Sequence, residues 1–211
     1  MGEITIPDEP ALGRRHHGNR HGRSEQARHA VLNAADDLLV ELGFAGLTME
    51  KIAVRAGVAK QTIYRWWPSK VDILLDALGG DLAQELTPPD HGDLRRDLRE
   101  HLAAVAEFLV TADAGAVLRA LLGQAQHDPE LADRLRAGHL SDQRARDRLP
   151  FERAVARGEL APGTDLDDAV ERLVGPVHYR VLVTGEPVPG SFTDALVDRL
   201  LASADCSPVV P

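Results

Sequence analysis

Apolar residues recur along most of this chain with the three-and-four spacing of an amphipathic α-helix. The first such stripe consists of Val31, Ala34, Ala35, Leu38, Leu39 and Leu42. Strictly alternating segments, which indicate β-strands, are scarce, and aromatic residues make up only 4% of the chain. The pattern therefore predicts an all-α protein of about nine helices.

Turn and cap residues divide the predicted helices into a small N-terminal domain and a larger C-terminal one. Ser24 begins the first helix as its N-cap, and Gly43 ends it. We expect residues 24–70 to form the small domain and residues 71–204 to form the large one. The ends of the chain carry no helical period, so a flexible arm and a tail are expected there, over residues 1–23 and 205–211.

Residues 47–70 predict two short helices joined by a tight turn. Thr48 can cap the first helix, and Gly57 occupies the turn, where a positive φ costs glycine almost nothing. The second helix, residues 60–67, turns its apolar side chains inward and leaves polar and basic ones outside. This arrangement is a helix-turn-helix, whose second helix can enter the major groove of DNA.

The same stretch resembles the N-terminal domain of the tetracycline-repressor (TetR) family of bacterial transcription regulators. The resemblance covers residues 24–78 and lies in the entry LVELGFAGLTMEKIA, the turn AGVAKQTIYRWW and the exit PSKVDILLDAL. Two positions depart from the family pattern: Ala59 replaces a common serine, and Trp66 replaces a smaller histidine or tyrosine. The resemblance implies a DNA-binding regulator, most often a homodimeric repressor that leaves its palindromic operator when a small molecule binds.

Polar residues of the helix-turn-helix are the expected contacts to double-stranded DNA. The side chains best placed for base edges are Lys60, Gln61 and Arg65. The expected phosphate contacts are Thr48, Thr62, Tyr64 and Lys70. Two further residues join this set, Trp66 on the second helix and Arg23 in the arm.

The net charge of −9 is unevenly distributed. Residues 1–70 hold 10 basic against 8 acidic residues, whereas the rest of the chain holds 14 against 25. Positive charge is thus concentrated at the predicted DNA-binding domain, and the acidic remainder disfavours unspecific binding to DNA. Residues 11–23 contain four arginines and no acid, so this arm either contacts DNA or is an extension that only aids solubility.

Five further helices are expected after a break at residues 87–92. Pro150 is expected to kink or break the helix that starts at Asp128, and Gly175-Pro176 to bend the following one. The segment ARGELAPGTDLDDAVERLVGPVHYRVLVTGEP resembles one C-terminal subtype of the TetR family. The resemblance therefore extends into the larger domain.

The last two predicted helices carry broad apolar surfaces, and the TetR family usually packs them against a second copy. A palindromic operator also demands a dimer, because the two half-sites are read by two heads. The expected interface residues are Val170, Val174, Val177, Val181, Leu196, Val197 and Leu200. The alternative is that these residues fill the core of a monomer.

An unidentified small-molecule effector, enclosed between helices of the larger domain, is a further implication of the resemblance. The candidate lining residues are His101, Val105, Phe108, Leu118, Leu121, Leu122, Gln124, His139, His178 and Tyr179. Most of them could equally be core residues. His178 and Tyr179, a polar pair in an apolar helix, could equally lie at the dimer interface.

Other classes of function find no support in the sequence. No phosphate loop, His-Glu-x-x-His pair or nucleophile elbow occurs, so we expect neither an enzyme nor a cofactor. The histidines of the arm lack the cysteine or carboxylate partners of a metal site. A single cysteine and the lack of a membrane-length apolar run predict a cytoplasmic protein. The alternatives are an activator, a regulator controlled by a protein partner, and a ligand-binding or catalytic bundle with a vestigial DNA-binding domain.

Overall fold

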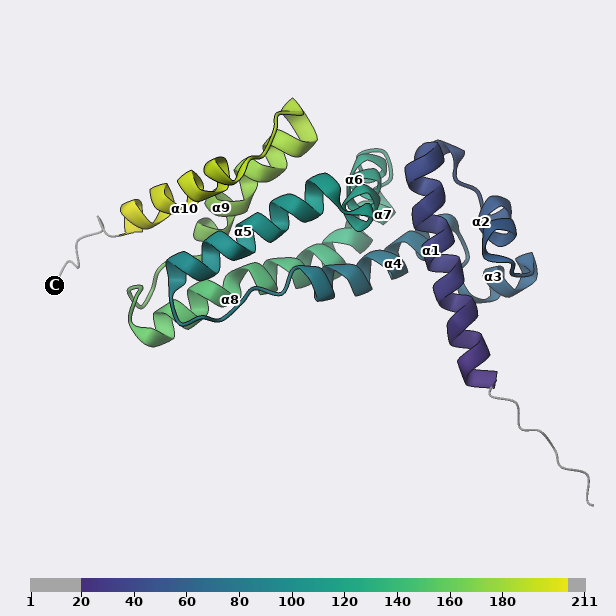
Figure 1. The fold of residues 1–211 in the computed structure, drawn as a ribbon, viewed down its shortest axis with the longest axis horizontal. Helices are drawn as coiled ribbons and strands as arrows, with labels where there is room; N and C mark the ends of the chain where they lie inside the picture. The colour runs from purple at the N-terminus through teal and green to yellow at the C-terminus, as the bar shows by residue number, and fades with distance from the viewer. Residues whose placement is uncertain (1–19, 205–211) are drawn as a thin grey trace, which may run out of the picture.

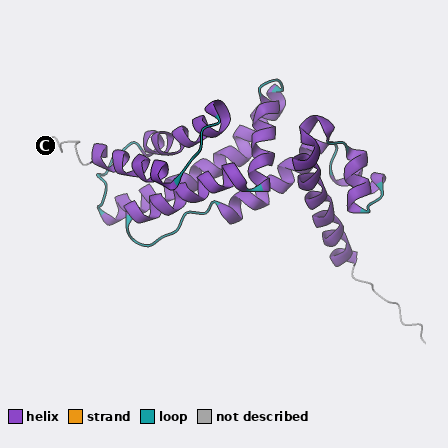
Figure 2. Ribbon diagram, turned by 45° about the horizontal axis from the view of Figure 1, so that its top comes forward, coloured by secondary structure: helices purple, strands orange, loops and turns teal. Residues whose placement is uncertain are grey.

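The computed structural model describes residues 20–204, which contain helices and loops and no strand (Figure 1; Figure 2). Its elements, with π-helical segments labelled η, are α1 (Arg20–Gly46), α2 (Met49–Ala56), α3 (Lys60–Trp66), α4 (Lys70–Glu85), α5 (Leu94–Thr111), α6 (Asp113–Ala125), α7 (Pro129–Leu135), η1 (Arg136–Leu140), α8 (Ser141–Arg157), α9 (Leu166–Tyr179), η2 (Arg180–Thr184) and α10 (Gly190–Ala204). Since η1 joins α7 to α8 and η2 continues α9, this range forms nine continuous helices. The predicted all-α class is confirmed.

Helices α1, α2 and α3 form a head at one end of the molecule, and α4 leads from it into a body made of α5 to α10 (Figure 1). Thr48 caps α2 as predicted, because its hydroxyl accepts a hydrogen bond from the Lys51 N–H at 3.3 Å. Gly57 ends α2 in the left-handed region, with φ 65° and ψ 30°. Ile52 and Ile63 are fully buried, so α3 packs with its apolar side inward.

The first helix begins earlier than predicted. Because α1 starts at Arg20, Ser24 lies inside the helix rather than at its N-cap, and the last residues of the predicted flexible arm are helical. Each residue added to an existing helix brings another backbone hydrogen bond, which outweighs the preference of one serine for the cap. Residues 1–19 of the predicted arm lie outside the described part of the chain. Gly43 has φ 69° and ψ 172°, a region open to glycine, and interrupts α1 where its end was predicted.

Helix α4 begins with a capping box. The Ser69 hydroxyl accepts from the Asp72 N–H at 3.4 Å, and the Asp72 carboxylate accepts from the Ser69 N–H at 2.9 Å. Leu74 and Leu78, on the buried side of α4, belong to one apolar cluster that runs from the head into the body. Helix α4 is therefore packed into both parts of the molecule.

The body is organised around α5, which contacts α6, α8, α9 and α10. The apolar stripe of α5 is buried, with Leu98 and Leu102 fully so. Of the kink or break predicted at Pro150, the break is wrong, because α8 runs through this residue from Ser141 to Arg157. The proline ring is buried, and its apolar burial offsets the missing backbone N–H. Helix α9 likewise continues through Pro176, and the irregular turns lie elsewhere, in η1 and η2.

Candidate nucleic-acid interface

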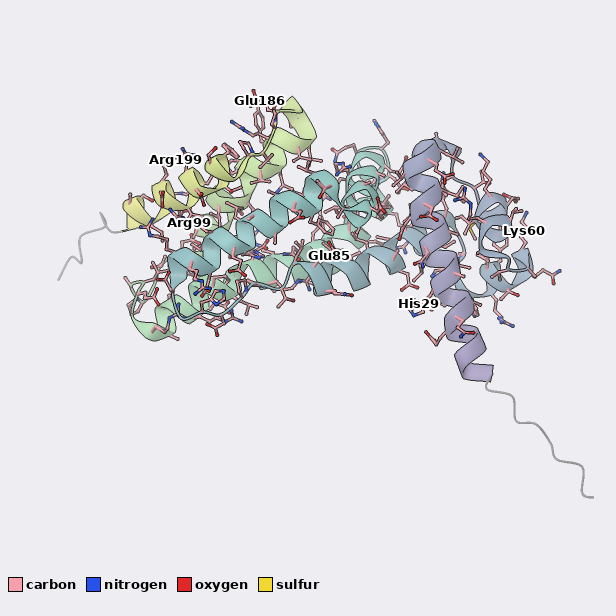
Figure 3. All side chains as sticks on the ribbon, in the orientation of Figure 1. His29, Lys60, Glu85, Arg99, Glu186 and Arg199 are labelled. Carbon is pink, nitrogen blue, oxygen red and sulfur yellow. The ribbon has the colours of Figure 1, made fainter. Side chains whose placement is uncertain are left out.

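The exposed face of α3 brings together most of the residues predicted to read DNA. Lys60, Gln61, Tyr64 and Arg65 are exposed, and Thr62 is half-buried beside them. Lys60 projects from the head on the side away from the body (Figure 3). This short helix, with polar side chains outward and a buried apolar side, has the form that enters a major groove.

Two tryptophans stabilise the end of α3. Trp67 is buried, and its ring meets the half-buried ring of Trp66 edge to face, with the centroids 5.4 Å apart. The guanidinium of Arg65 lies 5.8 Å from the centroid of the Trp66 ring, a cation–π distance. Trp66 thus supports Arg65 beside the exposed face of α3.

The remaining predicted DNA contacts lie outside α3. Thr48 is half-buried at the start of α2, where its hydroxyl already serves as the cap. Arg23 falls within α1, but its side chain lies outside the described part of the structure. These two predictions therefore stay predictions.

Lys70 has partners that the sequence analysis did not foresee. Its Nζ atom donates to the carbonyl oxygens of Phe44 at 2.6 Å and Leu47 at 3.0 Å, and it lies 4.1 Å from the centroid of the Phe44 ring. Burial lowers the pKa of Lys70. Two of the three ammonium protons are therefore engaged by the end of α1 and the loop after it, which leaves one for a phosphate.

A carboxylate that sequence reasoning missed joins three elements of the head. Asp76 in α4 accepts a hydrogen bond from the Trp67 indole N–H at 2.9 Å and forms an ion pair with Arg28 of α1. Asp76 therefore ties the end of α3 to α4 and α1. The partners Arg28 and Asp76 are 48 positions apart, so no local sequence pattern reveals them.

The predicted effector residues differ in their burial and their contacts. His101 is 1% exposed, and its Nε2 atom lies 2.8 Å from the Asp147 carboxylate, while Gln143 donates to the same carboxylate oxygen at 2.7 Å. The predicted residues that belong to the apolar core are Val105, Phe108, Leu118 and Leu121. Those at least partly open to solvent are Leu122, Gln124, His139, His178 and Tyr179. As a shared lining, the set stays a prediction, and four of its members are packed in the apolar core of the chain.

One of these residues, His139, does line a pocket. A space of about 460 Å³ lies between α1, α4 and η1, and its walls include Arg28, Asn33 and Asp76. Burial lowers the pKa of His139. The ring lies against Gly79 of α4, where an added Cβ atom would come within 3.0 Å of the histidine Cε1 atom. The pocket is thus at the junction of head and body.

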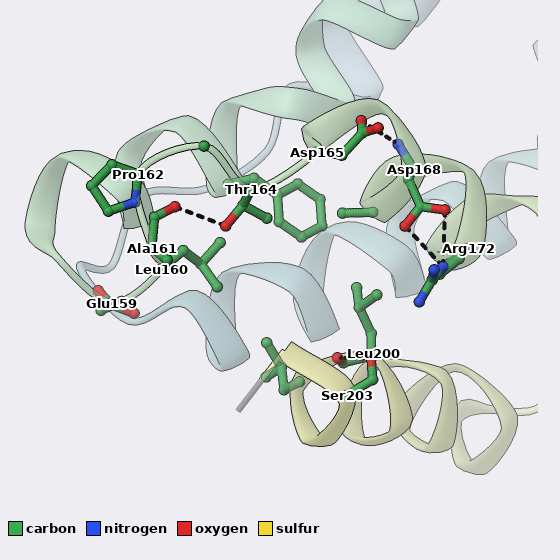
Figure 4. A pocket seen from close by; sticks show the side chains of 14 residues that line it. Glu159, Leu160, Ala161, Pro162, Thr164, Asp165, Asp168, Arg172, Leu200 and Ser203 are labelled. Atoms are coloured by element: carbon green, nitrogen blue, oxygen red, sulfur yellow. Dashed lines mark hydrogen bonds and ion pairs between the residues drawn. The ribbon is translucent and has the colours of Figure 1, made fainter. Parts of the chain in front are cut away.

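Another pocket, of about 420 Å³, lies at the end of the body remote from the head (Figure 4). Its apolar floor includes Phe151 and Leu200, and its rim includes Arg172, which forms a 2.9 Å ion pair with Asp168. None of the predicted effector residues lines this pocket. It is formed by the loop between α8 and α9 together with the start of α9 and the end of α10.

The predicted dimer residues divide into two groups. The residues buried within this single chain are Val170, Val177, Leu196 and Val197, and those half-buried are Val174, Val181 and Leu200. The side chains of the first group already fill the core of their own chain, so they have little surface left for a second copy. Apolar surface is exposed instead on the other side of α9 and η2, at Tyr179 (58%) and Leu182 (43%).

The described residues contain no group of three or more histidine, cysteine or acidic side chains arranged to hold a metal ion. Over the same residues, no helix is both long and apolar enough to cross a membrane.

Two family models match the chain. Residues 31–77 match the model of bacterial regulatory proteins of the tetR family, and residues 88–200 match a tetracyclin repressor-like C-terminal domain. The first match contains the helix-turn-helix, and the second covers the body up to α10.

Individual relatives of this chain indicate the same family. The HTH-type transcriptional regulator YdeS of Bacillus subtilis (strain 168) is 36% identical over 175 residues, which are 83% of this chain and 88% of that protein. The DNA-binding transcriptional repressor TetR of Mycobacteroides abscessus is 30% identical over 187 residues, 85% of this chain and 94% of that protein. The crystal structure of the TetR family regulator SCO0332 is 37% identical with a TM-score of 0.71, covering 84% of this chain and 97% of that one. This chain therefore belongs to the TetR family of bacterial transcription regulators.

Proposed function

We propose that this DNA-binding transcription regulator is a homodimeric repressor that recognises a palindromic operator and responds to a small-molecule effector. The observation that carries the proposal is the exposed face of α3, where Lys60, Gln61 and Arg65 lie side by side on a helix held by a buried apolar side. The relative from Mycobacteroides abscessus, which is named a repressor, supports the sign of regulation. Cytoplasmic localisation follows, since the operator lies there.

In this proposal α3 of each copy enters a major groove. Lys60 and Arg65 are suited to the O6 and N7 acceptors of guanine, and Gln61 is suited to adenine. Thr62 and Tyr64 lie on the same helix and hold the neighbouring phosphates. Two copies place two such helices on half-sites separated by about 34–36 Å or a multiple of it. The second copy packs against the exposed side of α9 and η2.

The effector acts through α4, the helix that is packed into both head and body. Two contacts from the segment α7–η1 support this route. Arg134 forms a 2.6 Å ion pair with Asp72, in the first turn of α4, and His139 packs against Gly79 two turns later. An effector that moves α7–η1 shifts α4 and the heads, and so changes the population of the state that fits the operator.

A regulator controlled by a protein partner is the second candidate. It is favoured by the burial of His101, Val105, Phe108 and Leu121, which leaves these side chains packed in the core rather than around a shared cavity. An effector found by ligand screening of thermal stability would reject this candidate, because a bound ligand raises the unfolding temperature.

The test is selection of bound fragments from bacterial genomic DNA by the purified protein at near-physiological salt, followed by sequencing. Enrichment of one inverted repeat is expected, and Gln61→Ala should relax the preference at one base pair of each half-site. Gln126→Ala, on the exposed surface of the body, is the matched control and should recover the wild-type repeat. Recovery of fragments without a common motif would contradict the proposal.

A further inference from the structure

An acidic side chain lies on the surface that is proposed to face DNA. Glu50 is the second residue of α2, Lys60 is the first residue of α3, and their side chains form an ion pair. Both remain largely open to solvent, at 57% and 50% exposure. The Lys60 ammonium also lies 5.6 Å from the centroid of the Tyr64 ring. The pair therefore joins the two helix starts of the helix-turn-helix.

Both members of this pair are charged at neutral pH. The hydrogen bond with Lys60 lowers the pKa of Glu50, and the same bond raises the pKa of Lys60. Each shift moves the pKa further from 7, so neither group titrates near neutral pH. Lys60 thus offers DNA an ammonium whose charge is already compensated by a neighbouring carboxylate.

The other cations of the head and the first residue of α4 also have partners within the chain. Lys51 donates to the Gly46 carbonyl at 2.8 Å, and Arg55 forms a 2.7 Å ion pair with Glu41. Arg28 and Lys70 have the partners described above. Among the lysine and arginine side chains that the structure describes in α1, α2 and α3, Arg65 alone contacts neither a carboxylate nor a carbonyl, and its partner is the Trp66 ring. Carboxylates therefore compensate the charges of Arg28, Arg55 and Lys60, whereas Lys51 and Lys70 keep their positive charge because a carbonyl oxygen is neutral.

We propose that Glu50 is a specificity-determining residue, which reserves Lys60 for base edges and lowers the affinity of the head for arbitrary DNA. The proposal rests on the DNA-reading function proposed for α3. It assigns to an acidic residue of α2 a part in recognition that its charge alone would not suggest.

The chemistry of the two targets explains the effect. An ammonium has three N–H donors, so Lys60 can keep its bond to Glu50 while it donates to a neutral base acceptor such as guanine O6. A phosphate is an anion, and a phosphate close to Lys60 is repelled by the Glu50 carboxylate. Unspecific binding depends on phosphate neutralisation and release of counterions. Glu50 therefore penalises unspecific binding more than operator binding.

The test compares wild-type protein with Glu50→Gln in fluorescence anisotropy titrations over a range of salt concentrations. The probes are an operator duplex recovered by the genomic selection and a scrambled duplex of the same length and composition. Glu50→Gln should bind the scrambled duplex about two- to five-fold more tightly, the effect of one exposed ion pair. Its salt dependence should steepen by about 0.9, the slope of one added phosphate contact. Operator affinity should change less, so the ratio of the two affinities falls.

Two controls isolate the Glu50–Lys60 pair. Glu41→Gln makes the same change of charge at the Arg55 pair, which joins α1 to α2 without Lys60, and it should leave the ratio unchanged. In a Lys60→Gln background, Glu50→Gln should not change the ratio of the two affinities further. An equal change in Glu41→Gln, or an undiminished effect without Lys60, would overturn the proposal in favour of net charge.

Failure of the underlying function gives a different result. If wild-type protein prefers no duplex over another, the proposed operator recognition is wrong. If wild-type protein prefers the operator and Glu50→Gln preserves that preference in full, the function stands and the inference about Glu50 is wrong.

Discussion

The indole N–H of Trp67 donates a hydrogen bond of 2.9 Å to the carboxylate of Asp76. This bond attaches the end of the recognition helix α3 to the second turn of α4, and the same carboxylate binds Arg28 of α1. The orientation of α3 thus depends on α4, the helix that also extends into the body.

Trp67→Phe should loosen this attachment while it keeps most of the buried ring. Loss of a hydrogen bond to a charged group should lower the free energy of unfolding by about 1.5–3 kcal/mol. Operator affinity should fall without a change in salt dependence, because no phosphate contact is removed. Urea unfolding and anisotropy titrations measure the two effects. Trp66→Phe is the control, since it keeps the bond to Asp76, and an equal loss of stability there would contradict the assignment.

Lys70→Met separates an anchoring residue from a phosphate ligand. If the bonds to the Phe44 and Leu47 carbonyls are its main contribution, the free energy of unfolding should fall by about 1–3 kcal/mol. The salt dependence of DNA binding should then stay as in the wild type. A slope that flattens by about 0.9, with stability preserved, would instead establish the phosphate contact.

Stability should decline in acid as Asp72 is protonated. Burial raises the pKa of Asp72. The hydrogen bond from Ser69 and the ion pair with Arg134 together lower it by more than burial raises it, so the net shift is downward. A carboxylate whose folded-state pKa lies below its unfolded value stabilises the fold above that unfolded value, about pH 4. This contribution is lost as the pH falls through the folded-state pKa.

Chemical unfolding of Asp72→Asn between about pH 2 and 7 tests the acid effect. The variant should lose about 1 kcal/mol near pH 7, the value of a helix cap, and its stability should depend less on pH below 4. Asp133→Asn is the control, because the Asp133 carboxylate is exposed and its partner, Arg136 at 3.7 Å, lies only three residues further along the segment α7–η1. A wild-type acid profile in Asp72→Asn would contradict the assignment.

Leu182→Lys tests the proposed dimer face. Leu182 is exposed in the single chain, so the charge should weaken dimerisation at least about tenfold and leave the fold intact. Sedimentation velocity over a concentration series gives the dissociation constant, and circular dichroism reports the helical content. Val110→Lys places the same charge at an exposed site near the end of α5 and should leave the dimer unchanged. Unaltered association of Leu182→Lys would exclude this face.

Gly115→Ala should destabilise the body. A Cβ atom at this position would collide with the Phe108 carbonyl group, whose carbon would lie at 2.9 Å, and this contact is with backbone that cannot rotate away. Overpacking of this kind costs about 1–3 kcal/mol. Gly123→Ala in the same helix meets nothing within 4 Å and should gain about 0.5–1 kcal/mol from helix propensity. The urea midpoint should fall below the wild-type value in Gly115→Ala and rise above it in Gly123→Ala. Equal midpoints in the two variants would contradict the packing argument.

Local patterns predicted the elements well. Thr48 and Gly57 act within a few residues of themselves, so this cap and this turn could be read directly from the chain. The start of α1 and the passage of α8 through Pro150 could not be read in this way. There, growth of a helix and burial of the proline ring outweigh a local preference.

Candidate surfaces were harder to predict because an apolar residue looks the same in a core and in an interface. Val170 and Val177 are buried by the body of their own chain, whereas Leu182 on the same continuous helix is exposed. The difference depends on which side of the helix meets α5 and α10. Periodicity identifies a stripe, but its neighbour is set by the packing of distant segments.

The amino-acid sequence by itself determined the helical class, the helix-turn-helix and the outward face of α3, since each depends on spacing and capping within one short stretch. Only the tertiary structure decided the partners of the charged groups. Lys70 meets the end of α1, Asp76 meets Arg28 and Trp67, and Lys60 meets Glu50. These contacts join residues on different helices, and their geometry exists only after the helices have packed against one another.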